Sequence, residues 1–450
     1  MTTDTQPAID SAHPDVREMV PVTRPVVGSA RVPGSKSITN RALLVAALAR
    51  GASTLTGALH SDDTRYMAAA LNALGLRVDS DEAGERFAVT GGDGTFPATS
   101  ADLFVGNSGT SMRFLTAALA LGHGRFRIDG VPRMRQRPLK PLLDVLTDLG
   151  VDARGEAVPG FPPALVQADG LRGGSVAMAG DQSSQFITGL LLASPSAAAG
   201  VTIGVTGALV SAPYIAMTID VMRAFGVEVE ADAAGRRFHV PPGQHYAGRA
   251  YHIEPDASNA SYFFVAAAAT GGRVRVDGLG TNSTQGDLDF VRVLERMGAT
   301  VTVAPDFTEV TGPSDGQLRG LDHDFSEISD TAQTLAAITP FAAGPTTIRG
   351  IGFIRHKETD RVAAMATELR RLGQAVDEFA DGLTIHPAPV QPADVATYDD
   401  HRMAMSFAVT GLRAPGVRIL DPGCVAKTFP TFFERLDELV GEGTGLETLC

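Results

Sequence analysis

The sequence is poor in the residues on which several classes of protein depend. Its 450 residues include only two cysteines, Cys424 and Cys450, too few for a disulfide framework or a cysteine-rich zinc site. Basic residues number 38 against 51 acidic ones, and the net charge of −13 has the wrong sign for general binding to nucleic acid or anionic membranes. No unbroken apolar stretch reaches about 18 residues, so we expect no membrane-spanning helix.

The first residues also lack the features of a targeting sequence. Residues 1–24 contain several acidic side chains and no apolar run. A secretory signal needs an apolar stretch of about 7–15 residues, and transit peptides contain few acids. We therefore expect residues 1–24 to form a disordered N-terminal tail on a cytoplasmic protein.

A short strand-like motif recurs through the rest of the chain, of which 44% is hydrophobic. Glycine is followed by alternating β-branched or apolar residues and usually by another glycine, as in GASTLTG and GRVRVDG. The copies begin at Gly51, Gly124, Gly200, Gly272, Gly344 and Gly416. Six copies at so regular a spacing predict six copies of one structural unit.

Two kinds of helix accompany each copy of the motif. An amphipathic helix that ends at glycine follows the strand, as in ALNALGLRV, and short strands follow that helix. A helix that is apolar on nearly every side precedes the strand, as in RALLVAALAR, and such a helix must be buried. We predict an α/β fold of six repeated β-α-β-α-β-β units.

The N-termini of the six buried helices are rich in polar residues. They read PGSKSITNR, GNSGTSMR, GDQSSQ, EPDASNAS, SEISDTAQ and YDDHRM. Ser, Asn and Asp at these places are expected as helix caps. A helix N-terminus also offers free N–H groups and a positive dipole end to an anion. If all six point into one space, they form an anion-binding cleft.

Basic residues, although few, cluster in or beside these segments. They are Lys36, Arg41, Arg113, Arg133, Arg135, Arg137, Lys140, Arg355, Lys357, Arg361, Arg402 and Lys427. Because guanidinium and ammonium groups bind carboxylate and phosphate, the clusters indicate a small substrate with several negative charges. We expect Arg133 to lie on a solvated face instead.

Three carboxylates near these cations are candidates for acid–base chemistry. They are Glu327, Asp330 and Glu358. A carboxylate held ionised among cations can act as a general base, but helix capping explains Asp330 equally well and an ion pair explains Glu358. The histidines show no metal-ligand spacing, so we expect no metal site.

Ten segments together resemble one known family. They are VPGSKSITNRALLVAAL, GNSGTSMR, RQRPLKPLL, SSQF, SAPYIAMT, DASNASYFF, ISDTAQTLA, RHKETDR, DDHRMAM and CVAKTFPTFF. In this order they resemble the 5-enolpyruvylshikimate-3-phosphate synthases, or 3-phosphoshikimate 1-carboxyvinyltransferases. The resemblance implies two domains of three repeats each around an interdomain cleft. Domain I would comprise residues 25–33 and 254–450, and domain II residues 34–253.

The resemblance also implies a reaction. A member of this family transfers the enolpyruvyl group of phosphoenolpyruvate to the 5-hydroxyl of shikimate 3-phosphate and releases phosphate, in the shikimate pathway of aromatic amino-acid biosynthesis. It needs no cofactor. We therefore expect these two small molecules as partners, no nucleic acid or membrane, and a monomer.

The resemblance assigns the substrate contacts residue by residue. The contacts to shikimate 3-phosphate would be Lys36, Ser37, Arg41, Ser183, Ser184, Gln185, Ser211, Asp330 and Lys357. The contacts to phosphoenolpyruvate would be Lys36, Gly109, Arg137, Gln185, Arg361, Arg402 and Lys427. Asp330 matches the carboxylate beside the 5-hydroxyl, with Glu327 as the alternative base. Glu358 matches the acid that protonates the methylene carbon.

Two residues depart from the family's pattern, and a third matches a glycine found in members that the inhibitor glyphosate affects. Phe353 stands where many members have a substrate-contacting asparagine, and Phe114 stands where proline is frequent. Gly109 matches the glycine of members that glyphosate inhibits in competition with phosphoenolpyruvate, so we expect that inhibition here.

Two other functions compete with this interpretation. The related UDP-N-acetylglucosamine enolpyruvyl transferase uses a reactive cysteine in its first half, whereas both cysteines here lie beyond residue 420. A non-catalytic repeat scaffold would not need different charged residues at equivalent helix starts.

Overall fold

Six strands with the glycine-bounded motif organise the fold. The computed structural model describes residues 15–442. The motifs form β3 (Ala52–Thr56), β7 (His123–Asp129), β11 (Val201–Thr206), β15 (Arg273–Asp277), β19 (Thr346–Arg349) and β23 (Val417–Leu420). Each strand belongs to a different one of the six sheets in the described residues. The α/β class and the six-fold repeat predicted from the sequence are confirmed.

The second unit shows how the elements of a repeat fit together. β6 (Ser100–Phe104) leads into the buried helix α3 (Gly109–Leu119), and β7 returns parallel to β6. The outer helix α4 (Lys140–Asp148) follows, and then β8 (Asp152–Gly155) and β9 (Ala164–Asp169) complete the sheet in the order β6-β7-β9-β8. Along β7, Phe126 and Ile128 are buried, whereas Arg125 is exposed, as expected when alternate side chains face the core.

The remaining units use the same kinds of element. The buried helices are α1 (Lys36–Leu48), α5 (Ser184–Ala193), α7 (Ala257–Thr270), α9 (Ala332–Ile338) and α11 (His401–Gly411). The outer helices are α2 (Asp62–Ala73), α6 (Pro213–Ala224), α8 (Phe290–Arg296), α10 (Arg361–Arg371) and α12 (Phe432–Glu442). The other strands are β1 (Val16–Glu18), β2 (Val27–Ser29), β4 (Arg77–Asp81), β5 (Arg86–Thr90), β10 (Gly174–Ala179), β12 (Glu230–Ala231), β13 (Arg237–Val240), β14 (Ala250–His252), β16 (Thr300–Val303), β17 (Phe307–Thr311), β18 (Asp322–Asp324), β20 (Ala375–Phe379), β21 (Gly382–His386) and β22 (Ala393–Val395).

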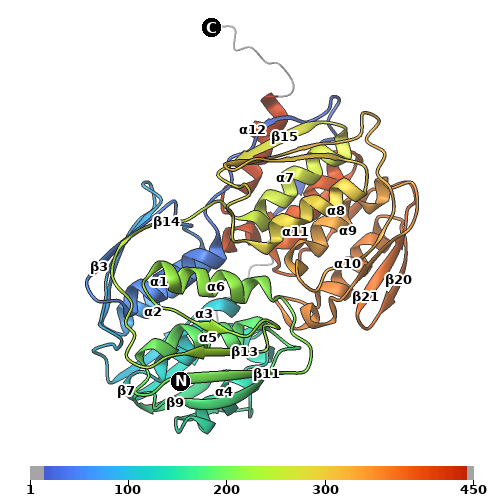
Figure 1. Ribbon diagram of the computed structural model, residues 1–450. Coiled ribbons are helices and arrows are strands. Elements are labelled where there is room, and N and C mark those ends of the chain that lie inside the picture. The colour runs from blue at the N-terminus through green and yellow to red at the C-terminus, as the bar shows by residue number, and fades with distance from the viewer. Residues whose placement is uncertain (1–14, 443–450) are drawn as a thin grey trace, which may run out of the picture.

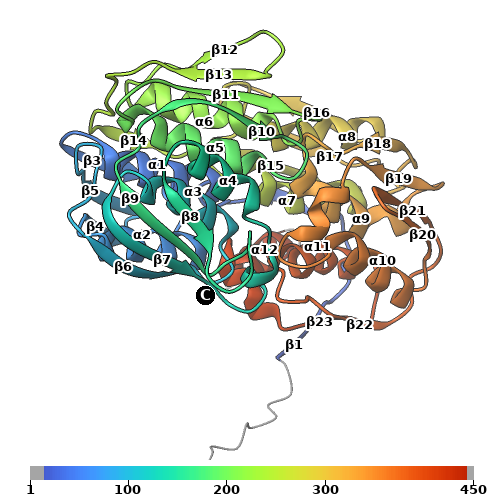
Figure 2. The same cartoon turned by 90° about the horizontal axis from the view of Figure 1, so that it is seen from below.

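The buried apolar side chains form two separate clusters. One draws on residues 38–253, which we call the middle lobe, and the other on residues 19–32 and 257–439, which we call the terminal lobe. Figure 1 shows the two lobes side by side, with α1, α3 and α5 in one and α7, α9 and α11 in the other. Figure 2 shows the sheets of each lobe lying around these helices.

The chain passes between the lobes at two adjacent places. Gly34 and Pro255 form an antiparallel bridge, and the backbone N–H of Ser35 donates to the carbonyl oxygen of Glu254 at 2.8 Å. β14 pairs with β3 in the middle lobe, and β2 pairs with β15 in the terminal lobe. The strands that flank the crossings, β2 and β14, are therefore each held in the first sheet of their own lobe.

Residues 15–24 correct one sequence-based prediction, because they belong to the fold rather than to a disordered tail. β1 pairs antiparallel with β23 in the three-stranded sheet β1-β23-β22, and Met19 is buried in the terminal lobe. The sixth unit has no strand after α12 among the described residues, and β1 fills an edge of its sheet. Three residues of strand in a polar context give too short a pattern to recognise. The rest of the expected tail, residues 1–14, lies outside the described residues.

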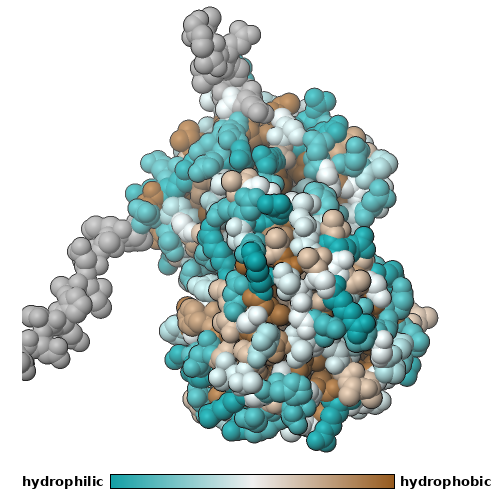
Figure 3. All heavy atoms as spheres, turned by 90° about the vertical axis from the view of Figure 1, so that its left-hand side faces the viewer, coloured by the Kyte–Doolittle hydropathy of each residue, from teal (hydrophilic) through white to brown (hydrophobic). Residues whose placement is uncertain are grey.

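The described helices include none that is both long and apolar enough to cross a lipid bilayer. On the face shown in Figure 3, hydrophobic residues are scattered among hydrophilic ones.

Candidate active site

The starts of several buried helices meet at one pocket between the lobes. In five of the six starts a side chain caps the helix: Ser35, Ser108, Ser183, Asp256 and Asp400 each accept a hydrogen bond from a backbone N–H in the first turn. The residues beyond these caps on α1, α3, α5 and α11 line the pocket. Capping therefore explains the polar segments locally, and the pocket explains why so many of them carry charge.

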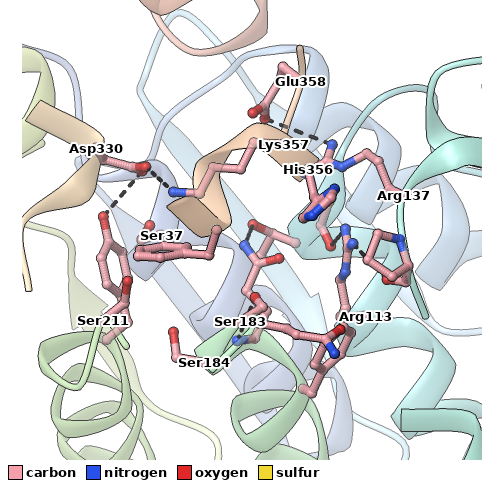
Figure 4. A pocket seen from close by; sticks show the side chains of 18 of the residues that line it. Ser37, Arg113, Arg137, Ser183, Ser184, Ser211, Asp330, His356, Lys357 and Glu358 are labelled. Atoms are coloured by element: carbon pink, nitrogen blue, oxygen red, sulfur yellow. Dashed lines mark hydrogen bonds and ion pairs between the residues drawn. The ribbon is translucent and has the colours of Figure 1, made fainter. Parts of the chain in front are cut away.

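The pocket gathers most of the residues singled out from the sequence. Its lining includes Lys36, Ser37, Gly109, Arg137, Ser183, Ser184, Gln185, Ser211, Asp330, Lys357, Glu358, Arg361 and Arg402. Figure 4 shows Asp330 beside Lys357 on one side, Arg137 beside Glu358 on another, and Ser183 and Ser184 facing them from the N-terminal end of α5. Arg41, Glu327 and Lys427 are not among the lining residues.

Arg41 lies behind the pocket wall. Its guanidinium donates to the hydroxyl of Thr218 at 2.8 Å and to the carbonyl oxygens of Ser37 at 2.8 Å and Tyr214 at 3.1 Å. Burial lowers the pKa of Arg41 to about 10. Its centre lies 5.2 Å from the ring centroid of Phe114, so the departure at Phe114 provides packing for this cation.

Lys427 and Lys36 are joined by a carboxylate that the sequence analysis missed. Asp63 accepts a hydrogen bond from Nζ of Lys427 at 2.9 Å and lies 3.6 Å from Nζ of Lys36. Lys427 also donates to the carbonyl oxygen of Asn107 at 2.8 Å. In the sequence Asp63 is an ordinary acidic residue in the first turn of α2, and only the fold brings Lys427 to it.

Asp330 lies among three cations of the terminal lobe. Its Oδ1 accepts from Nζ of Lys357 at 2.6 Å and from Arg361 at 3.4 Å, and its Oδ2 accepts from Arg402 at 2.8 Å. Burial alone would raise the pKa of Asp330, but Arg402, Lys357 and Arg361 hold it well below the usual value. Asp330 is therefore ionised at neutral pH.

Glu358 forms a second such cluster. Its carboxylate is 2.8 Å from Arg361 and 3.9 Å from Arg137, and the residue is 8% exposed. Burial would raise the pKa of Glu358, but the two arginines outweigh that effect and lower it well below the usual value. Asp400, which caps α11, holds Arg361 from behind with two hydrogen bonds of 2.8 and 3.2 Å. Arg361 thus stands between two candidate acid–base groups.

Glu327, the alternative base, lies away from this centre. It is exposed, and its carboxylate accepts a hydrogen bond from the backbone N–H of Ala212. Partial burial raises the pKa of Glu327 above its usual value. Of the two carboxylates, Asp330 is the one that lines the pocket.

Gly109 allows two arginines to approach the backbone closely. A Cβ atom at Gly109 would lie 2.3 Å from a guanidinium nitrogen of Arg137 and 2.7 Å from one of Arg113. Arg137 is fixed by hydrogen bonds to the carbonyl oxygen and side chain of Asn107, at 2.8 and 3.1 Å. Any larger residue at 109 must displace one of these cations.

Arg133 corrects another expectation, because it bridges the two lobes rather than facing solvent. From the middle lobe its guanidinium donates to the carbonyl oxygens of Arg355 at 3.2 Å, Lys357 at 3.0 Å and Glu358 at 3.1 Å in the terminal lobe. Three carbonyl groups converge on one planar donor, and this geometry is invisible in the sequence. Arg133 therefore fixes the backbone that carries two pocket residues.

The departure at Phe353 also lies in this segment. Phe353 lines the pocket, and Nζ of Lys357 lies 5.5 Å from its ring centroid. The face of this aromatic ring attracts the lysine cation.

The charges of the pocket define the ligand that it suits. Its lining includes six cations (Lys36, Arg113, Arg137, Lys357, Arg361 and Arg402) and three carboxylates (Asp63, Asp330 and Glu358). In a protein of net charge −13, this local excess of positive charge favours a small ligand that carries several negative charges. Residues 15–442 contain no group of three or more His, Cys, Asp or Glu side chains placed to hold a metal ion.

Comparison with known proteins agrees with this chemistry. The sequence pattern of the EPSP synthase (3-phosphoshikimate 1-carboxyvinyltransferase) family matches residues 20–436. The chain is 50% identical over 421 residues to the 3-phosphoshikimate 1-carboxyvinyltransferase of Trichormus variabilis, covering 94% of this chain and 98% of the relative. It is 47% identical over 413 residues to the protein of that name from Nitrosomonas europaea, covering 91% and 95%. The solved EPSP synthase of Acinetobacter baumannii matches with a TM-score of 0.77 at 26% identity, covering 94% and 97%.

Proposed function

The chain belongs to the EPSP synthase family, and from that premise we propose how its pocket transfers the enolpyruvyl group of phosphoenolpyruvate to the 5-hydroxyl of shikimate 3-phosphate. The observation that carries the proposal is the convergence of six cations from both lobes on one pocket that also contains two ionised carboxylates, Asp330 and Glu358. Both substrates are dianionic or more, with one carboxylate and one phosphate each.

Shikimate 3-phosphate is placed against the middle lobe and the centre of the pocket. Ser183 and Ser184 at the start of α5, together with Ser211, offer hydroxyl groups where the helix N-terminus favours an anion. Lys36, Ser37, Gln185, Asp330 and Lys357 complete the contacts. We assign Arg41 a supporting role, because its donors hold the backbone of Ser37 in place.

Phosphoenolpyruvate is placed where cations from both lobes face one another. Arg137 and the backbone at Gly109 belong to the middle lobe, and Arg361 and Arg402 belong to the terminal lobe. Lys36 and Gln185 lie within reach of both substrates. Lys427 reaches this side through Asp63, which also lies beside Lys36. Guanidinium forks suit the carboxylate and phosphate of this donor.

Three proton transfers at two carboxylates then convert the bound pair. Asp330 takes the proton of the 5-hydroxyl while the hydroxyl oxygen attacks the enol carbon of phosphoenolpyruvate. Glu358 gives a proton to the methylene carbon. The resulting tetrahedral ketal phosphate then loses phosphate while its new methyl group returns a proton to the Glu358 carboxylate, which forms the enol ether double bond of the product. The cations stabilise the developing charge in positions fixed before the reaction begins.

A phosphate-release assay with both substrates tests the proposal. We expect release only when phosphoenolpyruvate and shikimate 3-phosphate are both present, and none when either is omitted. UDP-N-acetylglucosamine in place of shikimate 3-phosphate should give no release. The cysteine that the described residues contain agrees with this, because burial raises the pKa of the Cys424 thiol to about 12 and leaves it unreactive.

We also propose that the two lobes are the two domains of the protein. Residues 34–253 would form one and residues 25–33 with 254–450 the other, so that both crossings lie at the hinge. We propose that the protein acts as a monomer, since both walls of the pocket come from one chain. We also propose that it acts in the cytoplasm.

Arg133 gives a prediction about closure of the lobes. Arg133→Ala removes the donor that binds three backbone carbonyl oxygens of the segment carrying Lys357 and Glu358, and we expect kcat/KM to fall about tenfold or more. Small-angle scattering should also show a smaller decrease in radius when both substrates bind. The control is Arg135→Ala, because Arg135 pairs with Asp129 within its own lobe. Equal kinetics for the two variants would contradict the role of Arg133.

Gly109 gives a prediction about the phosphoenolpyruvate side. Gly109→Ala should raise KM for phosphoenolpyruvate about tenfold, because the new methyl group displaces Arg137, while the affinity for shikimate 3-phosphate stays unchanged. Glyphosate, expected to compete with phosphoenolpyruvate, should lose more affinity than the substrate does. Gly344→Ala is the matched control, since a Cβ at Gly344 meets no atom within 4 Å. Unchanged inhibition in Gly109→Ala would refute the close-approach argument.

A further inference from the structure

Asp287 is a buried carboxylate next to the pocket for which the proposed mechanism has no role. It belongs to the 3-10 turn Gly286–Asp289 of the terminal lobe and is 5% exposed. Its Oδ2 accepts a hydrogen bond from the hydroxyl of Tyr214 at 2.5 Å, and its Oδ1 is buried without a hydrogen-bond partner in the described chain. The same hydroxyl of Tyr214 lies 3.3 Å from Oδ2 of Asp330. Three oxygen-bearing groups therefore form one chain that starts at the proposed base.

This chain crosses from one lobe to the other. Tyr214 lies in the first turn of α6 in the middle lobe and lines the pocket, whereas both carboxylates belong to the terminal lobe. The approach depends on Gly286, because a Cβ there would lie 2.3 Å from Cβ of Pro213. Nearby, the backbone N–H of Ser211 donates to the carbonyl oxygen of Ser326 at 2.9 Å. The tyrosine hydroxyl therefore reaches both carboxylates only when the lobes are packed together.

The two carboxylates differ in how well they can hold a proton. Asp330 accepts hydrogen bonds from three cations, and these positive charges disfavour its protonated form. Asp287 faces Asp330, Tyr214, Arg402 on α11 and Asp256 at the start of α7. Burial and the charge of Asp330 raise the pKa of Asp287 to about 7. A proton is therefore more stable on Asp287 than on Asp330.

We propose that Asp287 is the second acceptor, through the Tyr214 hydroxyl, of the proton that leaves the 5-hydroxyl of the acceptor substrate. The inference rests on the proposed function, in which Asp330 takes that proton first. Asp330 then passes it to the tyrosine oxygen while the tyrosine O–H proton moves to Oδ2 of Asp287. Asp330 is again a carboxylate, Tyr214 is unchanged and Asp287 is a carboxylic acid. Separation of the lobes exposes Asp287 and returns the proton to solvent.

The relay predicts a particular pH dependence. Asp287 must be ionised to accept a proton, so the rate of a single turnover should fall as the pH drops from 8 through about 7 to 6. The substrate phosphates also titrate in this range, but they do so equally with every variant. The part of the profile that disappears when Asp287 is replaced is the part that belongs to Asp287.

The test compares Asp287→Asn, Tyr214→Phe and the double variant in single-turnover measurements between pH 6 and 9, with enzyme in excess over both substrates. Asn still accepts the hydrogen bond from Tyr214 but takes no proton, so we expect a rate at pH 8 at least tenfold lower and the fall between pH 8 and 6 reduced. Tyr214→Phe should give the same result, and the double variant should be no slower than either single variant. The dissociation constant of shikimate 3-phosphate should stay within about threefold of wild type in Asp287→Asn.

Controls separate the relay from a structural role. Tyr246→Phe removes another buried tyrosine hydroxyl, bonded to the carbonyl oxygen of Leu192 at 3.0 Å, and should leave rate and profile unchanged. The folded pKa of Asp287 lies above its unfolded value, so its ionised form destabilises the fold above about pH 7. Asp287→Asn should therefore melt no lower than wild type at pH 8. If this variant does not fold, Tyr214→Phe decides the test alone.

Each remaining outcome overturns the relay. A rate within twofold of wild type, an unchanged pH profile, or additive losses in the double variant would each do so. If Asp330→Asn is inactive while Asp287→Asn is normal, the relay is wrong and the proposed function stands. If wild-type protein releases no phosphate from the two substrates, the proposed function itself fails.

Discussion

Lys36→Ala is expected to lower kcat/KM by about 10³-fold or more. Lys36 begins α1, lines the pocket and lies 3.6 Å from Asp63, which also binds Lys427. In the proposed mechanism it is the one cation that contacts both substrates, so its loss weakens binding and removes a charge from the reacting centre. The effect should appear in both kcat and KM, as for an interaction that is stronger in the transition state.

The measurement is steady-state phosphate release at several concentrations of each substrate. Lys140→Ala is the control, because Lys140 is an exposed lysine at the start of α4 that pairs with Asp144. Circular dichroism and thermal melting should show that Lys36→Ala is folded, since the side chain ends in the pocket and leaves no apolar cavity. A loss of less than about tenfold, or about 1.4 kcal/mol in barrier, would remove Lys36 from the reacting centre.

Local patterns determined how much of the fold could be predicted. Each repeated strand is recognisable from apolar or β-branched residues that alternate between two glycines. Each buried helix is recognisable because nearly all of its surface is apolar. The six units could therefore be predicted from residues that are close together in the sequence. β1 could not be predicted in this way, because three residues with one buried neighbour, Met19, leave no periodic signal. Its place depends on β23, some four hundred residues further along the chain.

In the site, too, residues could be predicted from their near neighbours in the sequence but not from partners far along the chain. Helix starts such as PGSKS and GNSGTSMR placed Lys36 and Gly109, because a capped N-terminus is recognisable in the sequence. Asp63 and Asp287 were missed, since each resembles an ordinary acidic residue in a first turn until a residue of the other lobe reaches it. Arg133 was misread for the same reason, because its three acceptors lie more than two hundred residues away.

Glu358→Gln is expected to lower kcat by about 10² to 10⁴-fold with little effect on substrate binding. In the free pocket Arg361 and Arg137 keep Glu358 ionised. When the carboxylate and phosphate of phosphoenolpyruvate bind these arginines, their positive charge is offset and the pKa of Glu358 rises, so the group can take up the proton that it delivers. Gln has the same shape and still accepts a hydrogen bond from Arg361, but it delivers no proton.

Three measurements distinguish this role from a structural one. In D₂O, deuterium should enter the methylene group of the product with wild-type protein and much more slowly with Glu358→Gln. The affinity for phosphoenolpyruvate, measured by calorimetry with shikimate 3-phosphate bound, should change by no more than a few-fold.

The third measurement is thermal melting. Because the folded pKa of Glu358 lies below its unfolded value of 4.5, the ionised group stabilises the fold at neutral pH, and this contribution disappears only as the pH falls below that value.

Glu358→Gln should therefore melt at a lower temperature than wild type at pH 7, and the difference should shrink only below about pH 4.5. Glu378→Gln is the control, because Glu378 pairs with Arg355 and Arg370 outside the pocket and should leave turnover unchanged. Normal turnover with normal deuterium incorporation in Glu358→Gln would show that another group protonates the methylene carbon. Loss of phosphoenolpyruvate affinity equal to the loss of kcat/KM would show instead that Glu358 only positions Arg361 and Arg137.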